Sequence, residues 1–146
     1  MGLRDRFIRP KIAFKDAALE DLLKEINFRG SFSACLLATG DGLPITAVPP
    51  DMDADTVSAM VALVQESVQR AQQGLDFPGV DEVSALFRNG VRLVCRYFDA
   101  AESPFILAVI LPNGREYRAV MDDAIARAGP LLATVPSQPQ MASMVI

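Results

Sequence analysis

GSFSACLLATGDGLPITAVP, residues 30–49, is the stretch that predicts local structure most clearly in this sequence. The apolar run Ser31–Ala38 indicates a mostly buried strand, and Thr39–Gly42 contains two glycines that can take the positive φ angles of a tight turn. Leu43–Val48 predicts a second strand. Because Pro44 has no N–H to donate to a neighbouring strand, we expect this second strand at the edge of a sheet.

An amphipathic helix precedes this hairpin. Leucine and isoleucine recur at helical spacing between Asp16 and Phe28, and charged residues fill the opposite side. Asp16 is suited to be its N-cap, and Gly30 ends it.

A second, longer helix is predicted from Asp53 to about Leu75. One apolar stripe along it suffices for packing on a sheet, and this stripe consists of Val57, Met60, Val61, Val64, Val68, Ala71 and Leu75. Ala59, Ala62 and Leu63 widen the apolar surface beyond what docking on one sheet requires. We therefore expect a second surface to cover part of this helix.

Three more strands follow. Glu82–Arg88 and Val91–Phe98 flank Asn89-Gly90, a strong hairpin-turn signal. The second of these strands should have one buried face and one partly wet face that carries Arg92 and Arg96, and the connector from Asp99 to Pro104 is polar and turn-like. Phe105–Leu111 is apolar at every position, as is typical of a central strand covered on both faces.

The last helix should follow Asn113, because Asn113 with Glu116 resembles a capping box. Gly129-Pro130 should stop or kink this helix near its end. The domain organisation that we expect is a basic N-terminal arm at residues 1–14, one domain at residues 15–132, and a flexible, uncharged C-terminal tail at residues 133–146.

The composition excludes several classes of function. A chain of 146 residues with 51% hydrophobic content can fill one core, and its formal charge of −4 argues against a nucleic-acid partner. The sequence has no histidine, so the usual general base and metal ligand are missing. Cys35 and Cys95 are isolated and suit small core residues in a reducing cytoplasm, and no apolar run is long enough for stable membrane insertion.

The element order helix, two strands, long helix, three strands, helix predicts an α+β fold with a single five-stranded antiparallel sheet flanked by helices. This profilin-like order resembles the roadblock family of dynein light chains and their bacterial and archaeal relatives, which partner small Ras-like GTPases. Residues 30–49 are similar to the first hairpin of that family, with its D-G turn followed by Leu-Pro-Ile. Leu111-Pro112-Asn113-Gly114, before the last helix, is a weaker match. The resemblance covers residues 16–132.

The resemblance implies a homodimer in which the long helices pack side by side and the third strands pair edge to edge. The residues implied at this seam are Val57, Met60, Val61, Val64, Val68, Val83, Ala85 and Phe87. The same valines could instead cover only their own sheet. An unpaired third strand would otherwise be an exposed sheet edge, which also favours dimerisation.

The resemblance further implies a non-enzymatic, cytoplasmic adaptor that binds and regulates or localises a small Ras-like GTPase. The implied contact surface is the polar flank of the long helix, with Gln65, Glu66, Gln69 and Arg70, which would otherwise be ordinary solvated helix surface. Arg92 and Arg96 could suggest an arginine finger, but alternating arginines on a strand usually pair with acidic neighbours across the sheet. We expect no catalytic residue, metal or cofactor.

Alternatives from other classes remain open. The chain could be a structural scaffold module that assembles through its joined sheet or tails, without a GTPase. It could also be a ligand-sensing or catalytic domain, which would need a deep pocket with convergent polar groups. Asp51, Asp53 and Asp55 alternate as in a calcium loop, but the Gly and the bidentate Glu of such a loop are missing, so we expect helix-capping acids.

Overall fold

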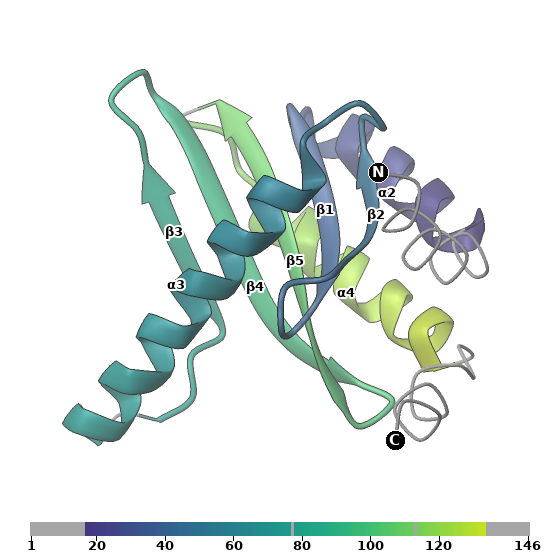
Figure 1. Cartoon of the computed structure of the whole chain (residues 1–146). Helices are drawn as coiled ribbons and strands as arrows, with labels where there is room; N and C mark the ends of the chain where they lie inside the picture. Colours follow the sequence, from purple (N-terminus) through teal and green to yellow (C-terminus); the bar gives the residue numbers. More distant parts are fainter. Residues whose placement is uncertain (1–16, 77, 113, 134–146) are drawn as a thin grey trace, which may run out of the picture.

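The computed structural model of the chain describes residues 17–76, 78–112 and 114–133 (Figure 1). Along the chain its elements are α2 (Ala17–Gly30), β1 (Ala34–Thr39), β2 (Pro44–Val48), α3 (Ala54–Leu75), β3 (Glu82–Leu86), β4 (Val91–Ala100), β5 (Ser103–Pro112) and α4 (Arg118–Ala133). This order confirms the predicted α+β fold. The predicted N-cap Asp16, the N-terminal arm, and residues 134–146 of the predicted tail lie outside the described residues.

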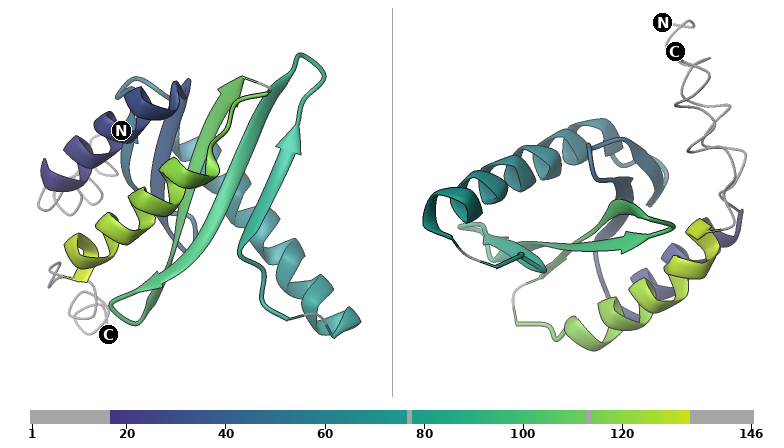
Figure 2. Two further views of the ribbon diagram at one scale, coloured as in Figure 1. Left: turned by 180° about the vertical axis from the view of Figure 1, so that it is seen from behind. Right: turned by 90° about the horizontal axis from the view of Figure 1, so that it is seen from below.

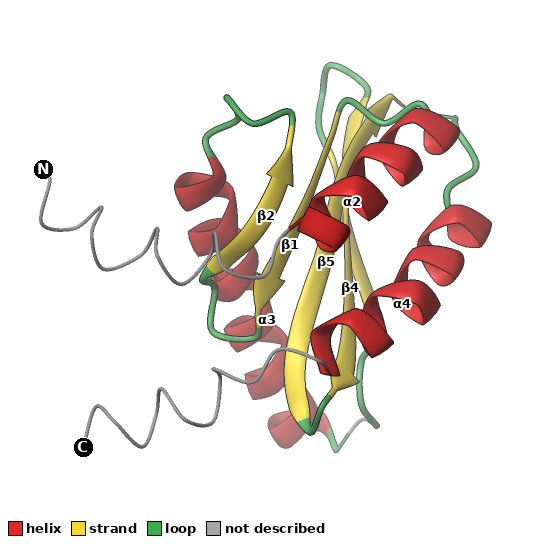
Figure 3. Ribbon diagram, turned by 90° about the vertical axis from the view of Figure 1, so that its right-hand side faces the viewer, coloured by secondary structure: helices red, strands yellow, loops and turns green. Residues whose placement is uncertain are grey.

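The five strands form one antiparallel sheet in the order β2-β1-β5-β4-β3. As predicted, β5 is central and β2 lies at an edge. Figures 2 and 3 show α3 alone on one face of the sheet and α2 and α4 side by side on the other. The protein thus has three layers, and the sheet lies in the middle.

Alternation along β5 divides the core between the two faces of the sheet. Phe105, Leu107 and Val109 belong to the larger core under α2 and α4. The intervening Ile106 and Ala108 belong to a smaller core beneath α3, together with Leu36, Val61, Leu93 and Cys95. The fully apolar run Phe105–Leu111 within β5 is therefore explained by burial on both faces.

Four charged side chains connect α2 to α4 on the outside of the molecule. Arg127 contacts Glu25 at 2.7 Å, and Arg29 contacts Asp123 at 2.7 Å. Arg127 also reaches Asp123, and Arg29 reaches Glu25, each at 3.3 Å. Hydrogen bonds from Arg127 lower the pKa of Glu25, and hydrogen bonds from Arg29 lower that of Asp123. We call these four residues the α2–α4 charge cluster.

The turn between β1 and β2 is packed against α3. Gly42 has φ +95°, and a Cβ built on it would lie 2.7 Å from the Cβ of Ala62 on α3. The turn is closed by a hydrogen bond from the N–H of Thr39 to the carbonyl of Leu43, at 2.9 Å. Glycine is therefore needed at position 42 both for its backbone angle and for the close approach of the helix.

Some predicted boundaries were wrong. β4 and β5 continue to a two-residue turn at Ala101 and Glu102, both with positive φ, instead of ending at a longer connector. These residue types do not signal such a turn. β3 ends at Leu86, so residues 87 and 88 lie beyond the strand.

The start and end of α4 also differ from the prediction. The helix begins at Arg118, whose N–H donates to the side chain of Glu116 at 3.0 Å; Asn113 lies outside the described residues. Pro130 does not end the helix, which continues to Ala133, the first residue of the predicted tail. Pro130 has no N–H to donate to the carbonyl of Ala126, four residues earlier in the helix. Ala126 is exposed, so its carbonyl can bind water instead.

The packing of Gly42 predicts that Gly42→Ala destabilises the protein by about 1–3 kcal/mol, because alanine disfavours positive φ and its methyl group would displace α3. Gly74→Ala is the matched control, since Gly74 lies in α3 with open space around it. It should stabilise the protein by about 0.5–1 kcal/mol. Urea unfolding of both variants checks this, and an equal effect of the two changes would contradict it.

The α2–α4 charge cluster predicts a loss of stability in acid. The folded-state pKa values of Glu25 and Asp123 lie below their ordinary values of 4.5 and 3.8. Their contribution is therefore fully present above these values and is lost as the pH falls through the lower folded-state pKa values. Urea unfolding between about pH 7 and pH 2 should show a weaker acid dependence in the double variant Glu25→Gln, Asp123→Asn than in Asp21→Asn, an exposed control on α2.

Candidate functional site

The helix α3 has a clearly defined start and end but is covered on only one side. The Asp53 side chain accepts a hydrogen bond from the N–H of Thr56 at 3.2 Å, and Asp76 ends the helix in the left-handed conformation. The capping role expected for Asp53 is thus confirmed. Of its 22 residues, only Ser58 and Val61 are buried. Most of the helix surface is therefore available for contact with another molecule.

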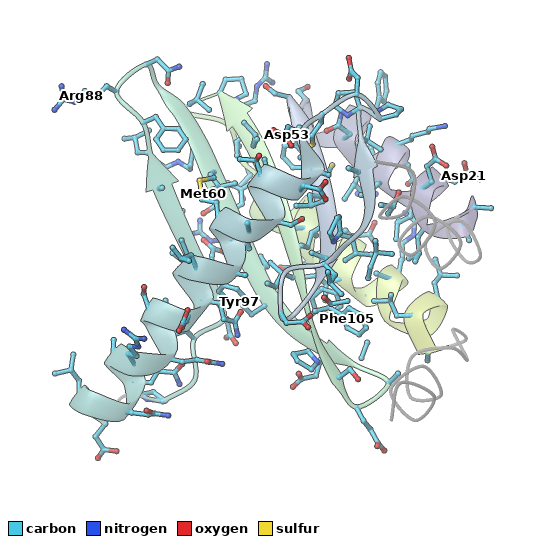
Figure 4. The ribbon with its side chains drawn as sticks, viewed as in Figure 1. Asp21, Asp53, Met60, Arg88, Tyr97 and Phe105 are labelled. Atoms are coloured by element: carbon cyan, nitrogen blue, oxygen red, sulfur yellow. The ribbon has the colours of Figure 1, made fainter. Side chains whose placement is uncertain are left out.

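Large apolar side chains lie on the outer surface of α3. Leu63 is 66% exposed and Met60 is 41% exposed, and Leu75 is also exposed at the end of the helix. Figure 4 places Met60 on the side of α3 toward β3. The predicted excess of apolar surface on the long helix is thus present in the structure.

The seam residues predicted on this helix divide into three groups. Met60 is exposed, and Val57, Val64 and Val68 are half-buried. Val61 is fully buried against its own sheet, which corrects its assignment to the seam, because it offers no surface to a second copy. Leu63 occupies the outward position instead. Leu63 lies outside the stripe that was predicted to pack on the sheet, and it is exposed as that stripe implies, whereas Met60 of the stripe is also exposed.

The seam residues predicted on the third strand lie at an open sheet edge. Among the described strands, β3 pairs only with β4. Val83 and Ala85 lie opposite Cys95 and Leu93 of β4, whose side chains belong to the core beneath α3. Val83 and Ala85 therefore face the same side of the sheet as α3.

Apolar side chains continue beyond the strand. Phe87, which follows β3, is 47% exposed. Leu86 is also exposed, although the prediction omitted it. Leu86 alternates to the other face of the sheet, so we call Met60, Leu63, Leu75, Ala85 and Phe87 the α3–β3 apolar surface.

Three of the four polar residues predicted as a partner surface are exposed on α3. Glu66 and Arg70 form an exposed ion pair at 3.3 Å, and Gln69 lies between them in sequence. Gln65 differs, because it is half-buried and its side-chain oxygen is enclosed without a hydrogen-bond partner among the described residues. The accessible polar flank of α3 thus consists of Glu66, Gln69 and Arg70.

The arginines of β4 lie on the opposite face of the sheet from α3. Arg96 contacts Asp122 of α4 at 2.9 Å and Glu82, its register partner on β3, at 3.8 Å. Arg92 donates to the hydroxyl of Ser84 at 3.4 Å. The expectation of an acidic partner across the sheet is therefore confirmed for Arg96.

Glu82 also accepts a hydrogen bond from the hydroxyl of Tyr117, at 2.7 Å. Burial, followed by this hydrogen bond, raises the pKa of Tyr117. These groups tie β3 and β4 to the start of α4.

The remaining reactive groups are enclosed. Cys35 and Cys95 are buried and unpaired, and burial raises the pKa of each thiol to about 12. Both thiols therefore stay protonated at neutral pH and are poor nucleophiles. Within residues 17–76, 78–112 and 114–133, no group of three acidic, cysteine or histidine side chains could hold a metal ion. None of the helices in the same ranges has the length and apolarity to cross a membrane.

Comparison with known proteins identifies the fold to which this architecture corresponds. No family model and no curated protein matches the sequence. The structure is similar to a Roadblock/LC7 domain from Streptomyces avermitilis, with a TM-score of 0.68 and 21% identity over 79% of this chain and 98% of that one. It is also similar to MglB from Myxococcus xanthus, with a TM-score of 0.63 and 12% identity over 82% of this chain and 94% of that one.

A gliding protein, MglB from Thermus thermophilus, is similar as well, with a TM-score of 0.59 and 17% identity over 81% of this chain and 87% of that one. These identities are low, but the likeness spans nearly the whole of each compared chain. Together with the element order and the sheet topology, it shows that this chain has the fold of the Roadblock/LC7 domain.

Proposed function

We propose that this chain is a non-enzymatic, cytoplasmic adaptor that forms a homodimer and binds a small Ras-like GTPase through the paired α3 helices. The observation that carries the proposal is the one-sided burial of α3, which leaves leucine and methionine side chains exposed beside an open strand edge. The roadblock resemblance supplies the class of partner, and the similarity to two MglB structures supports it.

The apolar side chains on α3 favour a second copy as the occupant of this surface. Covering a leucine or methionine side chain contributes about 1.5–3 kcal/mol when its burial is complete. Leu63 and Met60 lie one turn or less apart on the helix, so an antiparallel copy of α3 could cover both at once. One structure of the similar MglB is described as a tetrameric arrangement, which supports the proposal that this chain self-associates.

The open edge of β3 supports the same arrangement. Unpaired backbone groups along Glu82–Leu86 could bond to the same strand of a second copy and so join two sheets into one. The other edge of the sheet is less suited to pairing, because β2 begins at Pro44 and is followed by Pro49 and Pro50. A closed dimer is thus favoured over the alternative of an open scaffold, which would need two edges that can pair.

The polar residues Glu66, Gln69 and Arg70 are the proposed contact with the GTPase. They lie on α3 next to the apolar surface, so a dimer would present two copies of them close together. The Glu66–Arg70 pair is solvent-exposed and contributes little to the fold, so both side chains are free to form new ion pairs.

Leu63→Glu should convert the dimer to a monomer, because the exposed leucine would be replaced by a charge that would have to be buried in the seam. Sedimentation equilibrium should give twice the mass of one chain for the wild type and the mass of one chain for the variant. Gln73→Glu, an exposed change of the same charge on α3, should stay dimeric. A wild type that remains monomeric at high concentration would contradict the proposed seam, and growth beyond a dimer would favour the scaffold.

Arg70→Glu should weaken GTPase binding by about tenfold or more, since reversal of a charge at the contact opposes the partner's charge. The assay is direct binding to purified small Ras-like GTPases, each loaded with GDP or with a GTP analogue. Lys24→Glu on α2, on the other face of the sheet, is the control and should bind normally. The chain alone should leave GTP intact. Absence of any binding that depends on the nucleotide would refute the adaptor role.

A further inference from the structure

A cavity of about 490 Å³ lies between the C-terminal half of α3 and the adjoining ends of β4 and β5. Its size falls within the range of roughly 300–1,000 Å³ that is usual for small-molecule sites. Four of the side chains that line it are polar or charged and come from three segments: Gln65, Gln72, Asp81 and Asp99. Tyr97 also lines it, and Figure 4 shows Tyr97 beside the lower half of α3, near Phe105.

The topology of the fold brings these groups together. Tyr97 packs with the core beneath α3, and Asp99 is two residues further along β4, so both side chains lie on the α3 side of the sheet. The N–H of Tyr97 donates to the carbonyl of Asp81 at 3.0 Å, which fixes the 79–81 segment beside the strand. Gln65 and Gln72 are seven residues apart on α3 and therefore share one face of that helix.

Two polar atoms of the lining residues have no partner within the described part of the chain. The side-chain oxygen of Gln65 and the hydroxyl of Tyr97 are both enclosed, and neither forms a hydrogen bond there. Enclosed polar groups are nearly always hydrogen-bonded, because burial removes the water that would otherwise satisfy them. Burial also raises the pKa of Tyr97, so its hydroxyl stays protonated at neutral pH. Both residues line the cavity and lack the partner that burial normally requires, so a ligand that draws either side chain toward the cavity would supply it.

The charge of the cavity favours a cation. Asp81 and Asp99 are carboxylates, and none of the described residues that line the cavity is a lysine, arginine or histidine. Gln72 lies in the last turn of α3, which contains no basic residue, and the C-terminal end of a helix carries partial negative charge. A phosphate or carboxylate ligand would be repelled, and the volume is far larger than a bare metal ion requires.

We propose that this cavity binds an organic cation with N–H donors, either an alkylammonium or a guanidinium group. Asp81 and Asp99 neutralise its charge, the side-chain oxygens of Gln65 and Gln72 accept its hydrogen bonds, and the ring of Tyr97 provides an aromatic surface for the cation. The same chemistry could come from a free amine or from an arginine or lysine side chain of another protein.

Isothermal titration calorimetry on the full chain tests this site with two probes. Agmatine represents a free cation, and arginine blocked at both ends represents a side chain within a protein. We expect one probe to bind with one site per chain, and the probe that binds more tightly identifies the source. Inorganic phosphate should not bind.

Asp99→Asn should weaken the binding of the cation by about tenfold, because a charged acceptor becomes a neutral one while the exposed position leaves the fold intact. Tyr97→Leu should weaken it as well, because it removes the aromatic surface, with the fold checked by circular dichroism. Asp21→Asn on α2, far from Tyr97 in Figure 4, is the matched control and should bind as the wild type does. The proposal is overturned if neither probe binds at millimolar concentration, or if Asp99→Asn and Asp21→Asn bind equally well.

Discussion

The rest of the structure depends on the packing of the N-terminal half of α3 against the sheet. Val61 is fully buried in the core beneath the helix, and Gly42 lets the β1–β2 turn approach the backbone of Ser58 and the methyl group of Ala62. No side chain after Val61 in α3 is fully buried. The C-terminal half of the helix is therefore covered only in part, with Val64, Val68 and Gln72 half-buried.

The two faces of the sheet consequently have different roles. On one face, α2 and α4 enclose the larger core and are connected by the α2–α4 charge cluster. On the other face, α3 leaves both an apolar outer surface and a polar cavity under its C-terminal half. Stability thus resides mainly on the α2–α4 side, and the surfaces that we propose for partners and ligand are all on the α3 side.

The candidate site could be predicted only in part. The excess of apolar residues on the long helix was visible in the sequence, because the helical period alone shows how far around the helix these residues extend. The inward direction of Val61 agrees with its place in the predicted stripe, but that of Gln65 was not visible, because a polar side chain beside the stripe is expected to face solvent. The cavity was also missed, because Gln65, Asp81 and Asp99 are far apart in the chain and none of them belongs to a recognisable motif.

The sequence by itself determined the number, type and order of the elements, the central place of β5 and the edge position of β2. These features follow from local rules: the period of apolar residues, the glycine turns, and the missing N–H of proline. The tertiary structure alone decided the two-residue turn at Ala101 and Glu102, the continuation of α4 through Pro130, and the burial of the Gln65 side-chain oxygen beneath α3. Each of these features depends on how segments distant in sequence pack together and on which residues they leave exposed to solvent. A local pattern of residues does not contain this information.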